Sequence, residues 1–317
     1  MLSSLIKTYG EIMKNKAIYG GQAVVEGVMF GGKELQVTAI RRKNDEIEFY
    51  SIEKPSYKWL KQLKKIPFIR GIVAMIEASA IGSKHLTFST ERYDIDPEND
   101  DEVEEFKQSQ SGKLTMILGV AVVGVLSFFF GKLLFTAIPV FVANTLSPWF
   151  PGQIAQNLLE GLFKIMLLVG YLFAISQTPL IKRLFQYHGA EHKLINTFEN
   201  NEPLTVENIQ RNSRLHYRCG SSFMMLSVFV GVAIYIWFPI DSLVFRLVIR
   251  IALLPVVLGV SFEVLQLTNK FRELPALKFL GYPGLWLQRL TTKEPTADQI
   301  EVAIASFHEL QRLESGE

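Results

Sequence analysis

Residues 187–193 read Tyr187-His188-Gly189-Ala190-Glu191-His192-Lys193, lie between two strongly apolar blocks and contain two of the five histidines. Read as a helical turn, the segment places His188 and His192 on one face, where both imidazoles can bind one metal ion. The spacing His-x-x-Glu-His also occurs in a class of zinc peptidases. We therefore expect a helical metal site where a polar loop leaves an apolar block.

The composition predicts apolar blocks separated by charged segments. Hydrophobic residues make up 49% of the 317 positions and charged residues 20%, with a mean hydropathy of +0.20. The formal net charge is only +2, so we expect no nucleic-acid partner. The single cysteine, Cys219, allows no intrachain disulfide and fits a reducing compartment. Residues 1–18 predict a short amphipathic helix that lacks the features of a signal peptide, so membrane targeting is expected from internal spans.

A small cytosolic α+β domain is expected at residues 1–90. Within it, residues 35–42 and 46–52 alternate apolar and polar side chains around a short polar turn, which predicts a β-hairpin. Residues 68–89 are apolar but carry charges, so we expect a helix that packs on this domain or lies on the membrane surface. The acidic stretch 91–113 predicts a solvated linker.

Four apolar blocks between residues 114 and 267 predict a membrane domain with about four spans. A bilayer core requires about 20 apolar residues, so the first block is too long for one straight span and short for two. We expect it to span once, broken or tilted, with a re-entrant or interfacial extension. The blocks are Leu114–Leu146, Ile154–Leu180, Phe223–Phe238 and Leu243–Leu267.

Lysines and arginines set the expected orientation, because they favour the cytoplasmic side of a membrane. The loop at residues 182–220 is rich in them, whereas the two short links on the other side are poor in them. The N-terminal domain, this loop and the segment 268–317 are therefore expected in the cytoplasm. The sequence thus predicts a mainly α protein, a multi-pass helix bundle of the inner membrane with both termini cytoplasmic.

The central loop contains a second pair of metal-binding residue types, His216 and Cys219. If both pairs are helical, each presents two side chains on one face, and together they offer three histidines and a cysteine. This set suits zinc or another borderline divalent metal. The alternative is that the histidines lie at the membrane interface and that Cys219 is a small buried apolar residue. The same loop should contain a helix from 205 to 215 with Thr205 as its N-cap.

Three glutamates are further candidates for chemistry. Glu191 would activate a metal-bound water as a base or fix the tautomer of a neighbouring histidine. Glu26 lies in a glycine-rich run and is either a general base, a metal ligand, or a solvated or capping acid. Glu263 lies within the fourth apolar block, where it should face a polar cavity or pair with Lys270 or Arg272.

Four motifs resemble those of the YqhQ-like bacterial membrane protein family, in the same order and over nearly the whole chain. That family is a domain of unknown function described as a predicted metal-dependent enzyme. The resemblance implies a polytopic bacterial membrane protein with cytosolic parts. The motifs are Gly-Gly-Gln-Ala-Val-Val-Glu-Gly-Val-Met (20–29), Tyr-His-Gly-Ala-Glu-His-Lys (187–193), Arg-Cys-Gly-Ser-Ser-Phe (218–223) and Leu-Thr-Thr-Lys-Glu-Pro (290–295).

Three classes of function remain open at this point. The histidine and cysteine pairs favour a metal-dependent hydrolase with Glu191 or Glu26 as its base and zinc as its metal. The alternative is a scaffold or accessory factor in membrane-protein biogenesis, which would bind membrane-protein partners as well as membrane lipid. A transporter is the third class, suggested by charges such as Arg250 within apolar blocks but disfavoured by the absence of an internal repeat.

Overall fold

The computed structural model describes residues 19–55, 57–93, 130–131, 133–238, 242–270 and 278–316. The helix expected at 1–18 lies outside these residues. So do nearly all of the expected acidic linker and the first half of the first apolar block.

A four-stranded antiparallel sheet forms the N-terminal part, with its strands in chain order. The expected hairpin is confirmed as the outer pair β3–β4. The first two strands come from the glycine-rich run, for which no strands were predicted. The bounds are β1 (Gly20–Val24), β2 (Gly27–Gly31), β3 (Leu35–Arg41) and β4 (Ile47–Glu53).

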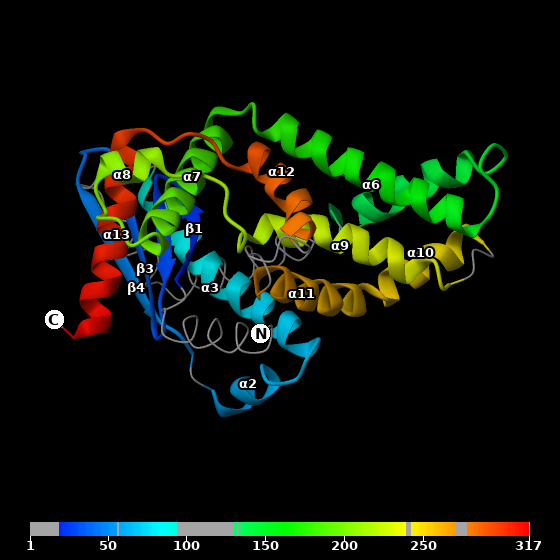
Figure 1. Ribbon diagram of the computed structural model, residues 1–317, viewed down its shortest axis with the longest axis horizontal. Coiled ribbons are helices and arrows are strands. Elements are labelled where there is room, and N and C mark those ends of the chain that lie inside the picture. The colour runs from blue at the N-terminus through cyan, green and yellow to red at the C-terminus, as the bar shows by residue number, and fades with distance from the viewer. Residues whose placement is uncertain are drawn as a thin grey trace, which may run out of the picture.

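Helices cover both faces of this sheet (Figure 1). Side chains alternate across a strand, so Val28 and Phe30 of β2 face one side and Met29 the other. The first side packs against α7 (Pro179–Glu199) and α13 (Ala297–Ser315), and the second against Phe88 of α3 (Ile69–Tyr93). The helix expected around 68–89 is thereby confirmed. We call the sheet with α7, α8 and α13 the sheet lobe.

The helix expected after Thr205 is α8 (Val206–Arg211), and the Thr205 hydroxyl caps it by accepting a hydrogen bond of 3.2 Å from the Asn208 N–H. The helix ends at Arg211 instead of continuing to residue 215, because Asn212 has an extended backbone. The chain from Asn212 onward is therefore free to turn back across α7.

The remaining helices form a second, helical lobe beside the sheet lobe (Figure 1). Its fourth apolar block is broken into α10 and α11, which meet at an angle of 50°. Pro255 near the start of α11 accounts for this break, since proline lacks the N–H that would continue the helix. The lobe comprises helix Leu133–Thr145, α6 (Gln153–Ile175), α9 (Gly220–Tyr235), α10 (Leu243–Ala252), α11 (Leu254–Lys270), η2 (Lys278–Gly281) and α12 (Tyr282–Thr291).

Among the described residues, α6 alone is long and apolar enough to cross a bilayer, and α10 with α11 would make a second span if the bent pair counts as one. Helix Leu133–Thr145 and α9 are apolar but shorter. The architecture is thus mainly helical with a small antiparallel sheet, as predicted.

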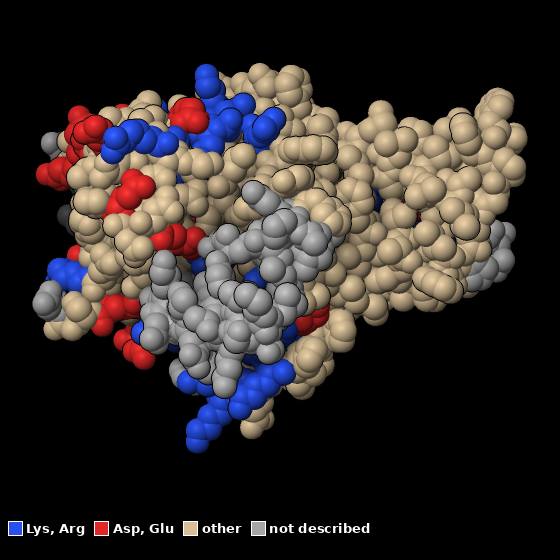
Figure 2. All heavy atoms as spheres, viewed as in Figure 1, with Lys and Arg blue, Asp and Glu red and all other residues tan. Residues whose placement is uncertain are grey.

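Charge is distributed very unevenly between the lobes. Figure 2 shows lysines, arginines and acidic residues over the sheet lobe and almost none on the visible surface of the helical lobe. The charges that the helical lobe does carry are largely internal: Glu160 lies 3.0 Å from Arg250 and 3.3 Å from Arg246, and all three are buried. The helical lobe is therefore apolar over the face that Figure 2 shows, and it encloses a charged cluster.

A short basic helix, α2 (Lys58–Leu63), precedes α3 and has no buried residue. It lies at the periphery of the molecule, below α3 in Figure 1.

Candidate metal centre

Helix α7 carries the two histidines of the predicted site. Tyr187, Ala190 and Leu194 recur at helical spacing and face the sheet core, so they fix the rotation of the helix about its axis. His188 and His192 then lie together on the neighbouring face, with ring centroids 4.4 Å apart. The helical arrangement expected from the sequence is confirmed for this pair.

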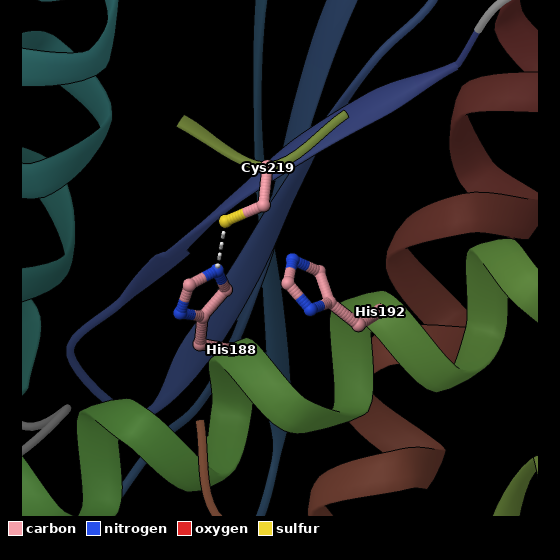
Figure 3. A group of neighbouring side chains, drawn as sticks. All are labelled: His188, His192 and Cys219. Carbon is pink, nitrogen blue, oxygen red and sulfur yellow. Dashed lines mark hydrogen bonds between the residues drawn. The ribbon is translucent and has the colours of Figure 1, made fainter. Parts of the chain in front are cut away.

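Three ligand atoms converge at this face of α7. One nitrogen from each of His188 and His192 and the sulfur of Cys219 lie within 4.8 Å of one another. Figure 3 shows both imidazoles pointing from α7 toward Cys219, whose Sγ is 3.3 Å from Nε2 of His188. In a tetrahedral zinc site, bonds of about 2.0–2.3 Å separate neighbouring ligand atoms by a little over 3 Å, so only small side-chain movements are needed.

Both histidines are held with the same ring nitrogen turned away from the site. Nδ1 of His188 lies 2.8 Å from the carbonyl oxygen of Thr291, and Nδ1 of His192 lies 2.7 Å from that of Arg214. A carbonyl oxygen only accepts, so each Nδ1 must carry a proton and donate it. In the neutral imidazole this leaves the Nε2 lone pair free, which is the state that a metal ion requires.

Glu191 lies between the two histidines and is buried. Its Oε2 is 3.9 Å from Nε2 of both His188 and His192. Burial raises the pKa of Glu191, partly opposed by His188 and by a hydrogen bond from the Gly21 N–H. Gly21 is required here, because a Cβ atom at this position would lie 2.6 Å from Cγ of Glu191. The glycine-rich first motif thus brings β1 against the carboxylate.

His216 lies near this group but outside it. Its ring centroid is 5.8 Å from that of His192, and within the described structure its buried Nε2 has no hydrogen-bond partner, with Oε1 of Glu199 3.7 Å away. Burial lowers the pKa of His216, although Glu199 partly opposes this. The structure therefore brings together three of the four predicted ligands and leaves His216 at the edge of the site.

The pair His216 and Cys219 is not helical, contrary to the condition on which the four-ligand prediction rested. These residues form a turn before α9, and Cys219 is the N-cap of that helix. Gln288 fixes the turn, because its side-chain oxygen accepts from the His216 N–H and its amide donates to the His216 carbonyl, both at 2.8 Å. The turn directs Cys219 toward α7 and leaves His216 beside it.

A cavity of about 130 Å³ opens at the three ligand atoms. A single water molecule needs far less space, so the cavity can accept a metal ion, a water molecule and a small part of a further ligand. Its walls are the side chains already described together with Tyr19, Gly20, Gly21, Ile195, Arg218 and Gly220.

The segment after α12 crosses α7 at Gly189 and closes the site from behind. The Lys293 N–H donates to the Phe185 carbonyl at 2.8 Å, and a Cβ atom on Gly189 would lie only 2.0 Å from the Lys293 oxygen. Lys193 of α7 pairs with Glu294 at 2.9 Å. All four motifs, which are far apart in the sequence, therefore meet around one cavity.

A comparison with known protein families covers three of these four motifs. The model of the family described as a protein of unknown function (DUF1385) matches residues 66–313. The chain belongs to this family. It is also 59% identical over 297 residues to the protein of Bacillus subtilis (strain 168) named "Uncharacterized protein YqhQ", a match that covers 94% of this chain and 93% of that one. No solved structure matches the chain.

The resemblance predicted from the four motifs is thereby confirmed. Three of the motifs lie within the part of the chain that the family model matches, and the first motif lies within β1 and β2, before residue 66. In this member of the family, the first motif nevertheless completes the site through Gly21.

Glu26, the other predicted catalytic acid, is held away from the metal ligands. Its Oε1 accepts a hydrogen bond of 2.5 Å from Nε of Arg183, and its Oε2 lies 3.2 Å from the hydroxyl of Tyr187. Its backbone adopts a positive φ of 52° in the turn between β1 and β2. Burial and the nearby Glu26 carboxylate raise the pKa of Tyr187. Glu26 thus joins α7 to the sheet and does not line the cavity.

Glu263 pairs with Arg70 of α3, with Nε of Arg70 2.8 Å from its Oε1, and not with Lys270 as the sequence suggested. Arg272 lies outside the described residues. The ion pair connects α11 to α3, two helices that are far apart in the sequence.

The residues that sequence reasoning missed act mainly through their backbone. The carbonyl oxygens of Thr291 and Arg214 orient the histidines, and the glycines at 21 and 189 allow close approach. The glycines within the quoted motifs were a signal for such approach, whereas a backbone carbonyl has no counterpart in the sequence pattern.

Proposed function

We propose that this protein is a membrane-embedded, metal-dependent hydrolase, with zinc held by His188, His192 and Cys219 near the cytosolic face of the membrane. One observation carries the proposal. Two Nε2 atoms and one Sγ converge, and both histidines are fixed by backbone carbonyls in the tautomer that leaves Nε2 unprotonated.

Zinc is the metal that this set of ligands suits best. Imidazole nitrogen and thiolate sulfur are its common ligands, and hard cations such as magnesium prefer oxygen. Three protein ligands leave one position open, as in catalytic rather than structural zinc sites. When bound, zinc would act as a Lewis acid and lower the pKa of a water molecule in that position.

Glu191 is the group best placed to move a proton at this site. Its Oε2 is 3.9 Å from both Nε2 atoms, which places it beside any water held between them. Its raised pKa brings the carboxyl closer to neutral pH, where a general base is most effective. Glu191 would therefore take the proton of the attacking water at Oε2 and pass it to the leaving group.

His216 distinguishes the catalytic from the structural form of this proposal. Its Nε2 is buried without a hydrogen-bond partner among the described residues, so a movement toward His192 would supply a fourth ligand. Four protein ligands would close the site and favour a structural zinc. That outcome would support the non-catalytic scaffold, because the metal would then stabilise a docking surface for partner proteins.

The membrane part of the proposal rests on the character of the helical lobe. Its surface is apolar and its charges face inward, the reverse of a water-soluble bundle (Figure 2). All four tryptophans of the chain are exposed, among them Trp237 at 84% and Trp149 at 70%. Exposed tryptophans are costly in water but favoured at both surfaces of a bilayer.

The topology that follows is about four spans in the inner membrane, with the sheet lobe and both termini in the cytoplasm. Helix α6 is about 34 Å long at 1.5 Å per residue, sufficient for the hydrocarbon core. Helix Leu133–Thr145, α9 and the α10–α11 pair would complete the bundle. Membrane lipid is then the surrounding partner of the helical lobe.

Metal analysis of the purified protein tests the centre directly. We expect about one zinc ion per chain after dialysis, and loss of most of it in His188→Ala, His192→Ala and Cys219→Ser. His308→Ala is the matched control, because His308 lies exposed on α13. A protein without bound zinc, iron or manganese, or with equal metal in all four variants, would refute the site.

Two further variants separate catalysis from structure. His216→Ala should retain zinc if the site has three ligands and lose it if the site has four. Glu191→Gln should retain zinc but abolish metal-dependent hydrolysis in a screen of ester, amide and phosphoester substrates. If Glu191→Gln is as active as the wild type, Glu191 is not the base.

A further inference from the structure

The segment before α3 combines many basic residues with exposed aromatic and aliphatic ones. We call residues 57–70 the α2–α3 elbow; they contain four lysines, one arginine and no acidic residue. Tyr57 and Trp59 are 59% and 60% exposed, and Phe68 is 53% exposed. A surface that is both apolar and basic suits neither the protein interior nor plain solvent.

Three of the five positive charges in the elbow have no ion-pair partner among the residues that the structure describes. Lys64 pairs with Glu77, and Arg70 pairs with Glu263. No ion pair of Lys58, Lys61 or Lys65 is found within the described structure, and all three side chains are exposed. Blue lysine side chains accordingly project from the lower edge of the molecule in Figure 2.

The elbow is attached to the helical lobe at a definite level. The Phe68 N–H donates to Oε1 of Glu263 at 2.9 Å, and Gly259 of α11 allows the Phe68 backbone to lie against it, because a Cβ there would be 2.8 Å from the Phe68 oxygen. Glu263 precedes Lys270, the last residue of α11, by seven residues, or about 10 Å along the helix. The elbow thus lies close to the end of α11 that adjoins the sheet lobe.

From these positions we infer that the α2–α3 elbow binds anionic lipid headgroups at the cytosolic surface of the membrane. The inference rests on the membrane part of the proposed function and is independent of the metal centre. The aromatic and aliphatic side chains would enter the interfacial layer, and the unpaired lysines would contact phosphate groups.

Charge and apolar character together favour a lipid surface over other acidic partners. A nucleic acid or an acidic protein segment would neutralise the lysines but leave Trp59, Phe68 and Ile69 in water. An anionic membrane satisfies both groups at once, because lysines extend their charge toward the headgroups while their stems cover apolar surface. Three such lysines near a surface correspond to about a 100-fold stronger attraction of the elbow to an anionic than to a neutral membrane.

Tryptophan fluorescence in lipid nanodiscs tests this inference. A variant that retains only Trp59, with Trp149, Trp237 and Trp286 replaced by phenylalanine, is reconstituted with brominated phosphatidylglycerol or brominated phosphatidylcholine at equal mole fraction. We expect phosphatidylglycerol to quench Trp59 at least twofold more strongly. The preference should disappear in high salt and in the added triple variant Lys58→Gln, Lys61→Gln, Lys65→Gln.

A second single-tryptophan variant that retains Trp237 is the control, because that residue follows the C-terminal end of α9, the end remote from Cys219. It should be quenched equally by the two lipids. Equal quenching of Trp59 by both lipids would overturn headgroup recognition, and quenching of Trp59 by aqueous iodide alone would place the elbow in water. If Trp237 also escapes quenching by lipid, the membrane proposal itself fails, which is a different result.

Discussion

Replacement of Gly189 by alanine should reverse the usual effect of this change in a helix. Alanine is ordinarily favoured over glycine in a helix interior by about 1 kcal/mol. At Gly189, however, the new Cβ would lie 2.0 Å from the Lys293 oxygen, where ordinary contact begins at 3.4 Å, so that carbonyl must retreat by about 1.4 Å. The close neighbour is backbone, which cannot rotate away as a side chain can.

The cost can be estimated from the contacts that this movement disturbs. Overpacking of this kind costs about 1–3 kcal/mol, and loss of the Lys293 N–H bond to the Phe185 carbonyl costs about 1 kcal/mol more. After the helix propensity gain, Gly189→Ala should destabilise the protein by about 1–3 kcal/mol. For a chain of this size, that corresponds to a fall in Tm of roughly 1.5–4.5 °C.

The same movement should weaken the metal centre, because Thr291 lies two residues before Lys293 and its carbonyl fixes Nδ1 of His188. Loss of such an orienting bond lowers metal affinity by about 10–100-fold. Thermal unfolding in detergent and competition with a zinc chelator measure the two effects. Gly170→Ala is the matched control, since nothing lies within 4 Å of the added Cβ in α6. If Gly189→Ala and Gly170→Ala show equal Tm and zinc affinity, the close contact between Gly189 and the Lys293 carbonyl is refuted.

Three further predictions follow from buried polar groups. Burial lowers the pKa of His85 to about 4, so the stability that this residue contributes is complete above pH 6.5 and is lost as the pH falls toward 4. The loss amounts to about 3 kcal/mol. It should be smaller in His85→Gln, as measured by Tm as a function of pH. Burial raises the pKa of Glu191, so ionisation of its carboxyl group lowers the stability of the protein as the pH rises above 4.5. Glu191→Gln should therefore raise the Tm of the metal-free protein at pH 7. An unchanged Tm would contradict this prediction. Arg183→Met leaves the Glu26 carboxylate buried without its cation. This should lower the free energy of unfolding by about 1–2 kcal/mol, a modest value because Arg183 is half exposed. The double variant with Glu26→Gln should recover part of that loss, as measured by urea unfolding.

The sequence identified the elements whose periodicity is strong and missed those built from glycine. Strands β3 and β4 alternate along their length, so this hairpin was predicted correctly. Strands β1 and β2 were not predicted, and their glycines are there to allow close contact. Gly27 shows the reason, since a Cβ atom there would lie 2.1 Å from the Ala39 oxygen of β3.

The candidate metal site was predictable where its residues are close together in the sequence. His188 and His192 are four residues apart on one helix, so their spacing alone predicted their proximity. Cys219 was identified as a ligand type, but its approach to α7 depends on a turn whose geometry Gln288 holds from α12. Glu26 was proposed as a base because it is a lone acid in an apolar run, and its partner Arg183 is 157 residues away in the sequence.

If the candidate site binds a metal as proposed, its arrangement couples metal binding to completion of the fold. The ligands come from α7 and from the turn before α9, and the carbonyls that orient the histidines come from Arg214 and Thr291. Gly21 of β1 positions Glu191, so segments from nearly the whole chain must assemble before the site exists. A metal that binds only the assembled state stabilises it by mass action, by about 2.7 kcal/mol at 100 times its dissociation constant. Zinc should therefore raise the Tm of the wild type but not that of Cys219→Ser, even if the natural substrate is never found.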